Sequence, residues 1–215
     1  RILAAWDQFK NTGPAPAGYS YGTEYDNPTD LIAAAADTVN IYSYATHGSH
    51  VAGIAGGSGA GTPYRGIGFE ANYLFTTFLV DEGAVLDAWQ WMNDKAIAEG
   101  KRLVINMSLG LYHMDAIDGT SIISQALDAY SSENVVFVTS GGNNGDTPFH
   151  IKKSYAGDTM KTRINFYSNP GLASVWGQSV HMWGGVGNEI SSAIQILDLS
   201  NQVLDQSPWY NTGTT

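Results

Sequence analysis

The chain contains no cysteine among its 215 residues, which excludes disulfide bonds, thiol catalysis and cysteine-based metal sites. Charged residues are scarce as well. They make up 14% of the chain, and 20 acidic side chains against 10 basic ones leave a net charge of −10. This balance disfavours nucleic acid and anionic membrane surfaces as partners. No apolar stretch approaches the length of a membrane span, so we expect no membrane-spanning segment within this chain.

Hydrophobic residues, in contrast, make up 43% of the chain and aromatic residues 12%. This composition indicates a compact folded protein and excludes a disordered one. A chain of this length can bury a sizeable core, as one large domain or as one domain with a small appendage. The sequence starts directly with the apolar run "RILAAWDQ", without a signal peptide or an initiator Met. We therefore expect a piece of a longer protein.

The first part of the chain, residues 1–150, alternates apolar strands with helices. The predicted strands cover residues 1–8, 71–80, 103–109 and 135–140, and the predicted helices cover residues 31–36, 47–57, 84–99 and 121–132. Residues 10–30 are rich in Gly, Pro and Asn, which is typical of a loop. Strands that are apolar throughout and alternate with helices indicate an α/β fold, with a parallel sheet covered by helices on both faces.

The character of the sequence changes near residue 150. The runs "TRINFYSN" (162–169), "SVHMWGG" (179–185) and "SAIQILDLS" (192–200) are strand-like, are separated by Gly and Asn turns, and show no helical period. We therefore divide the chain into an α/β part, residues 1–150, and a small all-β part, residues 151–215.

Three polar motifs lie where this α/β arrangement would place functional groups. The stretch "ATHGSHVAGIAGG" (45–57) predicts a helix of small residues packed tightly against a sheet, with His47 at its N-terminal end. "NMSLG" (106–110) and "SGGNNG" (140–145) follow two predicted strands. In an open α/β sheet, functional groups gather at the carboxyl ends of the strands. A histidine in this position serves either acid-base chemistry or metal binding.

These three motifs, in this order, resemble those of the subtilisin-like serine proteases, and the resemblance extends over about residues 30–146. It implies that His47 is the general base that takes the proton of a serine nucleophile. It also implies that the side-chain amide of Asn143 stabilises the oxyanion, with Asn144 as the neighbouring candidate. The second histidine of the motif, His50, is interpreted as structural.

The resemblance further implies a substrate-binding segment. Ser108, Leu109 and Gly110 stand where the family pairs its exposed backbone with the substrate backbone, as an added strand. The partner implied is therefore a polypeptide substrate. No cofactor and no metal are expected, because the common calcium loop of the family has no clear counterpart here.

A triad also needs an aspartate and a serine, in the family order Asp, His, Ser. Asp7 follows an apolar strand, but Gln8 and Phe9 stand where the family has Ser/Thr and Gly. The "GTSII" at residues 119–123 precedes Asn143, whereas the family serine follows it, so Ser121 is interpreted as a helix N-cap. After Asn143 no Gly-Thr-Ser occurs.

The stretch "RILAAWDQ…YGTEY" resembles a segment found after the catalytic aspartate in some bacterial relatives, among them the spore-germination proteases of clostridia. Those relatives carry a jelly-roll-like insertion between the oxyanion asparagine and the serine. We therefore expect an incomplete subtilisin-like catalytic core (1–150) and part of such an insertion (151–215). The function implied is serine endopeptidase activity of the full protein, inactive in this chain alone and, as in most of the family, secreted or periplasmic.

Other interpretations stay open at this point. Singly, a histidine at a helix start is most often a capped or surface residue, and Asn-Asn-Gly is most often a turn. A subtilisin-like scaffold can also be catalytically dead and serve binding. A metal-dependent hydrolase would use His47 and His50, but their i, i+3 spacing is not that of H-E-x-x-H, and no third ligand is evident. "GGSGAGTPYRG" (56–66) follows a helix and lacks Gly-Lys-Ser/Thr, so a turn is expected there rather than a phosphate loop.

Overall fold

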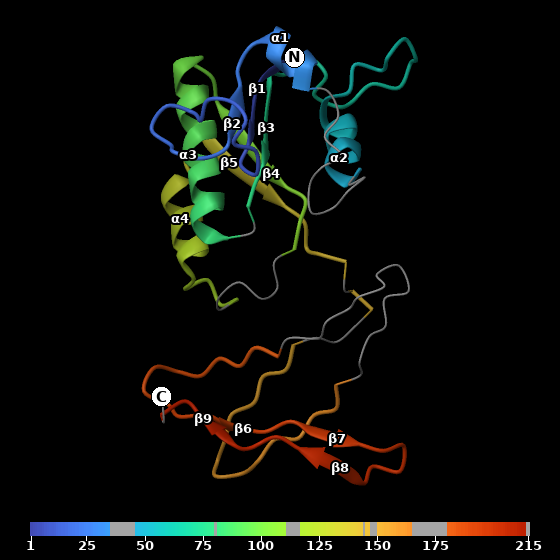
Figure 1. The fold of residues 1–215 in the computed structure, drawn as a ribbon, viewed down its shortest axis with the longest axis vertical. Coiled ribbons are helices and arrows are strands. Elements are labelled where there is room, and N and C mark those ends of the chain that lie inside the picture. The colour runs from blue at the N-terminus through green and yellow to red at the C-terminus, as the bar shows by residue number, and fades with distance from the viewer. Residues whose placement is uncertain are drawn as a thin grey trace. The chain divides into compact units, whose positions relative to one another are not determined.

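The structure is a computed structural model that describes residues 1–34, 46–79, 81–110, 117–143, 145–146, 150–164 and 180–213. The chain separates into two compact units, Arg1–Ile151 and Lys152–Thr215. Figure 1 shows their helices and strands. That residues 151–215 belong to a jelly-roll-like insertion stays a prediction.

The first unit alternates strands and helices, which confirms the mixed α/β class. Its strands are β1 (Ile2–Asp7), β2 (Thr23–Tyr25), β3 (Tyr73–Thr77), β4 (Leu103–Met107) and β5 (Val135–Thr139). Its helices are α1 (Pro28–Ala34), α2 (His47–Gly56), α3 (Glu82–Ala98) and α4 (Ile122–Tyr130). Each predicted helix and strand of this unit is present, with ends shifted by a few residues.

The short strand β2 was not predicted, since the sequence around it is typical of a loop. It pairs antiparallel with β1, and Ala5 lies opposite Tyr25. The hydroxyl of Thr23 holds the turn that leads into it: it accepts from the backbone N–H groups of Thr12 and Gly13 at 3.2 and 3.1 Å and donates to the carbonyl of Lys10 at 2.7 Å. A three-residue strand held by one side chain has too few positions to show an alternating pattern.

The strands form two ladders in the described part of this unit. In the first, the order is β2-β1-β3, with β1 and β3 parallel; in the second, β4 and β5 are parallel from Leu103↔Val135 to Met107↔Thr139. The parallel pairs are those that the alternation of strands and helices predicts, because a helix must carry the chain back to the start of the next strand.

Helix α3 packs against both ladders and so connects them. Its Trp91 lies in one buried cluster with Trp6 of β1, and its Trp89 lies in a second cluster with Ile105 of β4 and Val135 of β5. The helix begins at Asp81, whose carboxylate accepts from the N–H of Ala84 at 2.9 Å. It ends before Gly100, whose positive φ of 62° is typical of a glycine that follows the last turn of a helix.

Helices cover both faces of the β1–β3 ladder. Successive residues of a strand point to opposite faces. In β3, Tyr73 reaches α2 by a 2.9 Å hydrogen bond to the carbonyl of Ala55, while the next residue, Leu74, packs in the cluster that contains Trp91. Figure 1 accordingly shows α2 on one side of the strands and α3 with α4 on the other.

The β4–β5 ladder differs, because only one of its faces is covered by described helices. Ile105 and Val135 are buried under α3 and α4, whereas Val104, Val136 and Val138 on the opposite face are about half exposed or more. Strands that are apolar throughout predicted two covered faces, and among the described helices none lies over this second face.

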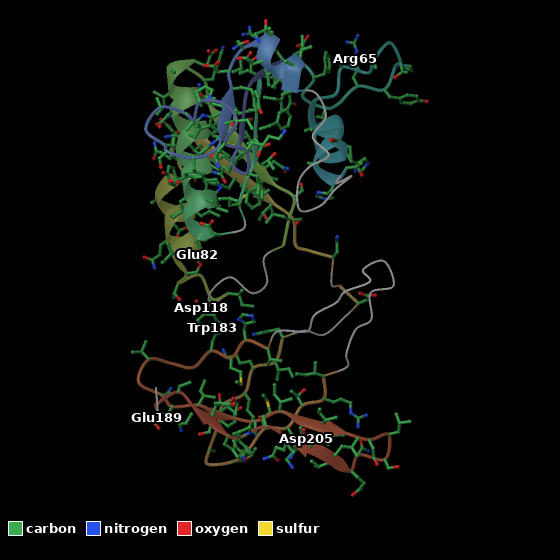
Figure 2. All side chains as sticks on the ribbon, viewed as in Figure 1. Arg65, Glu82, Asp118, Trp183, Glu189 and Asp205 are labelled. Atoms are coloured by element: carbon green, nitrogen blue, oxygen red, sulfur yellow. The ribbon has the colours of Figure 1, made fainter. Side chains whose placement is uncertain are left out.

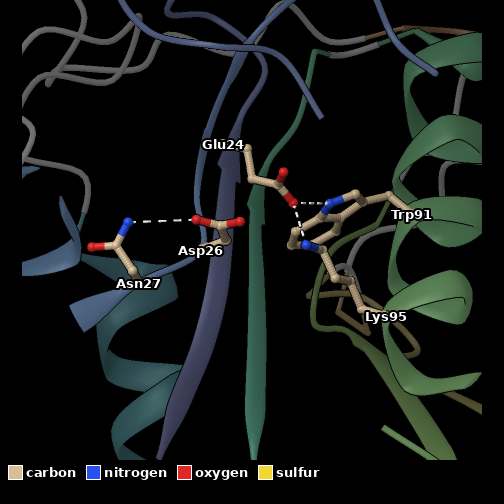
Figure 3. A network of polar contacts seen from close by, with 5 residues as sticks. All are labelled: Glu24, Asp26, Asn27, Trp91 and Lys95. Atoms are coloured by element: carbon tan, nitrogen blue, oxygen red, sulfur yellow. Dashed lines mark hydrogen bonds and ion pairs between the residues drawn. The ribbon is translucent and has the colours of Figure 1, made fainter. Parts of the chain in front are cut away.

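A polar network ties β2 to α3 (Figure 3). One carboxylate oxygen of Glu24 accepts from the indole N–H of Trp91 at 2.8 Å and pairs with the ammonium of Lys95 at 2.7 Å. The Glu24 side chain is 13% exposed, so this pair is only partly screened by water. The network therefore fixes the edge strand on the helix, next to the aromatic cluster of Trp6 and Trp91.

The loop before β2 is held on α3 by two tyrosines. Tyr21 donates its hydroxyl to the Asp87 carboxylate at 2.7 Å, and Tyr19 donates to the Asp87 carbonyl at 3.2 Å. Burial, with the Asp87 charge adding to it, raises the pKa of Tyr19 to about 12 and also raises the pKa of Tyr21. Both rings therefore stay neutral donors at physiological pH.

The second unit contains four short strands. β6 (Ser191–Ser192) pairs antiparallel with β9 (Tyr210–Asn211), and β7 (Gln195–Leu197) pairs antiparallel with β8 (Val203–Gln206). The strand expected over 192–200 is thus found in part. The strand expected over 179–185 is not present in its described residues, 180–185, which belong to no helix or strand. The run 162–169 lies mostly outside the described residues.

Candidate active site

Helix α2 presents His47 as its first residue. His47 is exposed, and so is Thr46, the N-cap residue before it. The last residue of the helix, Gly56, lies against Tyr73, the first residue of β3. Since α2 lies beside the strands (Figure 1), its first turn points toward the carboxyl end of β3. That His47 acts as a general base stays a prediction.

The expected close packing of the small residues is found at one end of α2. A Cβ added to Gly56 would collide with the ring of Tyr73, so a larger residue there would displace this ring and its hydrogen bond to Ala55. At Gly48 and Gly53, in contrast, an added Cβ would meet no described atom within 4 Å. Within the described residues, the helix is packed tightly at its C-terminal end and open at its N-terminal end.

Residues 57–66 form turns, as expected for "GGSGAGTPYRG". The N–H of Thr62 donates to the carbonyl of Gly59 at 2.7 Å, and Gly59 and Gly61 both have a φ of 85°. The guanidinium of Arg65, labelled in Figure 2, lies 5.0 Å from the centre of the Phe69 ring. The arrangement is a local turn that follows a helix.

The predicted substrate segment, Ser108–Leu109–Gly110, directly follows β4. The side chains of the next strand in the ladder reach it. The hydroxyl of Thr139 donates to the carbonyl of Met107 at 3.1 Å, and the hydroxyl of Ser140 donates to the carbonyl of Leu109 at 3.3 Å. Neither hydroxyl was singled out from the sequence, in which "VVFVTS" (135–140) was interpreted as a buried strand.

These contacts decide which backbone groups of the segment face β5. Along a strand, the N–H and C=O groups of alternate residues point to opposite edges. Leu103 donates its N–H to the carbonyl of Asn134, and Met107 and Leu109 receive hydroxyls from the β5 side, so the odd-numbered residues face β5. Ser108 and Gly110 therefore direct their backbone groups to the other edge.

Asn143 lies in the loop after β5 and is exposed. The turn before it contains Gly142, whose φ of 89° favours glycine. Since β4 and β5 are parallel and in register, the structure brings this loop and the segment 108–110 to the same end of the ladder. Asn144 lies outside the described residues. The oxyanion role of Asn143, the substrate role of the segment and the proximity of His47 to Asn143 stay predictions.

The two remaining triad candidates have structural contacts. Asp7 ends β1, is 8% exposed, and accepts from the N–H of Phe9 at 3.0 Å. The hydroxyl of Ser121 accepts from the N–H of Ser124 at 3.0 Å, and the side chain is 6% exposed, which confirms the predicted N-cap of α4. A buried hydroxyl engaged in a cap is poorly placed to attack a substrate.

Two further observations concern what the site can hold. In the described ranges, no three His, Asp or Glu side chains gather closely enough to bind a metal ion. Among the helices that the structure describes, none has the length and apolarity that crossing a bilayer requires.

Comparison with known proteins agrees with the motifs. The profile of the subtilase family matches residues 20–191, a range that includes all three motifs. Among solved structures, the CspB protease of Clostridium perfringens is similar, with a TM-score of 0.51 and 18% identity; the match covers 67% of this chain and 31% of that protease. At this identity the likeness shows a shared fold, a partial subtilisin-like α/β core. The family profile matches well over half of this chain, so the chain belongs to the subtilase family.

Proposed function

We propose that the polypeptide carrying these residues is a serine endopeptidase. The observation that supports this most directly is the family match over residues 20–191, with the His47, Ser108–Gly110 and Asn143 motifs inside it. The part of the chain that matches the CspB protease covers 31% of that protease, so the proposal concerns the whole enzyme. The 215 residues alone are expected to be inactive, because no Gly-Thr-Ser follows Asn143.

In this mechanism His47 is the general base. A serine hydroxyl becomes an effective nucleophile when a neighbouring imidazole removes its proton as it attacks the peptide carbonyl, and the imidazolium then protonates the leaving amine. The exposed first turn of α2 leaves the His47 ring accessible to such a partner. His50, three residues further along the same helix, takes no part in this proposal.

Asn143 is proposed to stabilise the negative charge that develops on the carbonyl oxygen. An amide donor aimed at that oxygen is stronger in the transition state than in the ground state, so it raises kcat. Meanwhile, Ser108 and Gly110 are proposed to pair with the substrate backbone, because their N–H and C=O groups face the edge away from β5. The substrate is then a polypeptide bound in extended form.

The test uses the intact enzyme and casein as substrate. His47→Ala is expected to abolish hydrolysis, whereas His50→Ala, the matched control on the same helix, is expected to leave it largely intact. Asn143→Ala is expected to lower kcat by about 10²- to 10³-fold, the range established for the corresponding donor of subtilisin. Full activity of His47→Ala would rule out the proposed base.

The alternative is a subtilase scaffold used for binding. It would be favoured if the intact protein binds an extended peptide and hydrolyses no substrate. Treatment with a reagent that phosphorylates reactive serines distinguishes the two functions. The enzyme is expected to be labelled at one serine, and His47→Ala is expected to prevent the labelling. A binding scaffold is not labelled.

A further inference from the structure

The segment that follows β4, Ser108–Gly110, is not held by the backbone ladder between β4 and β5. The backbone ladder between β4 and β5 ends at the pair Met107↔Thr139, and Ser108–Gly110 lie beyond it. Ordering free residues costs conformational entropy, and a substrate that pairs with a disordered edge must supply that cost on binding. A contact that orders the segment beforehand therefore favours substrate binding.

Two side-chain hydroxyls add contacts at the end of the ladder, one within its last backbone pair and one beyond it. Thr139 donates to the carbonyl of Met107 at 3.1 Å; its hydroxyl also lies 3.5 Å from the Ser140 carbonyl, but its single proton serves the shorter contact. Ser140 donates to the carbonyl of Leu109 at 3.3 Å. Met107 already belongs to the ladder, whereas Leu109 does not. Of the two hydroxyls, only that of Ser140 holds a residue of the segment itself.

We propose that Ser140 is a positioning residue for the polypeptide substrate. By holding the Leu109 carbonyl on the β5 side, its hydroxyl fixes the backbone groups of Ser108 and Gly110 at the opposite edge. This inference rests on the proposed function, in which that edge pairs with the substrate. Ser140 touches no reacting atom, so its effect is on binding and not on the chemical step.

A second contact supports the same segment from within. The side-chain amide of Asn106 donates to the hydroxyl of Ser108 at 3.0 Å, which is a bond between two residues on the same face of the extended chain. Thus the carbonyl of Leu109 is tied to β5, and the side chain of Ser108 is tied to β4. Of these two contacts, only that of Ser140 joins the segment to the neighbouring strand, and it therefore decides which backbone groups face away from β5.

The Ser140 contact is exposed, so its loss should barely change overall stability. We expect Ser140→Ala to shift the Tm of the intact enzyme by less than about 2 °C. In contrast, KM for an extended peptide substrate should rise about threefold to tenfold with kcat nearly unchanged, since one hydrogen bond is lost. KM for a single-residue ester, which does not use the edge, should stay the same.

Two variants complete the experiment. Ser140→Thr keeps the hydroxyl and is expected to restore KM for the extended peptide, while Thr139→Val, the matched control, is expected to change it less than about twofold. The positioning role is overturned if Ser140→Ala leaves KM for the extended peptide unchanged. It is also overturned if KM rises equally for the ester.

Failure of the proposed function would be recognised separately. Backbone hydrogen exchange needs no activity, and the amides of residues 109 and 110 should exchange faster in Ser140→Ala than in Ser140→Thr. An inactive protein with this difference would contradict the endopeptidase but not the role of Ser140 in ordering the segment. Equal exchange in the two variants would contradict the role of Ser140.

Discussion

The two units of the chain differ in how far their described tryptophan side chains are buried. In the first unit, Trp6, Trp89 and Trp91 are 0%, 2% and 3% exposed. In the second, Trp183 (labelled in Figure 2) and Trp209 are 57% and 61% exposed. The first unit has a 17-residue helix, α3, that packs on two parallel ladders, whereas the described part of the second has only two-stranded antiparallel pairs.

The difference shows what a core requires. A pair of strands with no other element packed on either face leaves both faces open to solvent, and it is marginally stable by itself. In the described residues of the second unit, no side chain is buried, although Ile196, Val203 and Leu204 lie on its strands. A groove of about 400 Å³, whose lining includes Met182, Ile190 and Trp209, is open to solvent. Apolar composition alone therefore does not make a core; a second layer does.

The largest effect that tests this comparison is a tryptophan truncation in each unit. Trp91→Ala removes a 3% exposed ring that packs on Trp6 and donates to Glu24, so we expect a loss of about 3–5 kcal/mol of unfolding free energy. Trp209→Ala, the matched control, should change it by less than about 0.5 kcal/mol, because the ring is exposed. Urea unfolding followed by circular dichroism measures both. Equal losses would mean that Trp209 is buried in solution.

The next effect concerns the pH dependence of the first unit. The pKa of Tyr19, raised by burial and by Asp87 from 10.0 to about 12, means that folding disfavours the tyrosinate form. Since the folded pKa lies above the unfolded one, this stabilisation is fully present below pH 10 and is lost as the pH rises through about 12. We expect the free energy of unfolding to fall over that window.

The double variant Tyr19→Phe with Tyr21→Phe provides the control. It loses the two hydrogen bonds to Asp87 and is less stable at neutral pH, but it lacks the two hydroxyls of Tyr19 and Tyr21, whose ionisation is disfavoured by folding. Its free energy of unfolding should therefore decline less between pH 10 and 12. Denaturant titrations at each pH measure the slope, and an equally steep decline in the variant would assign the alkaline loss to other groups.

The helices and parallel strands of the first unit were predictable because their signals are local. Helix α3 shows apolar residues at helical spacing, an Asp at its start and Gly100 after its end, and all three features operate in the structure. The strand β2 was not predictable, because it has only three residues and the turn before it is closed by a side-chain contact, from the Thr23 hydroxyl to the Lys10 carbonyl. That bond joins residues 13 positions apart.

The candidate site follows the same division. The motifs after β4 and β5 indicated the end of the ladder at which polar groups gather, since the direction of parallel strands fixes that end. The contact between Ser140 and Leu109 could not be predicted from the sequence, because it depends on the register in which Met107 lies opposite Thr139. A shift of one residue in that register would give Ser140 a different partner.

The smallest expected effect concerns Ser121, the serine of "GTSII". Its hydroxyl accepts from the N–H of Ser124 and caps α4, which packs on the core of the first unit. Ser121→Ala should therefore lower the free energy of unfolding by about 1 kcal/mol, whereas Ser131→Ala, at the exposed C-terminal end of the same helix, should cost less. In the intact enzyme kcat should be unchanged. Abolished hydrolysis with intact folding would instead make Ser121 the nucleophile, and the cap would then be the wrong explanation for its conformation.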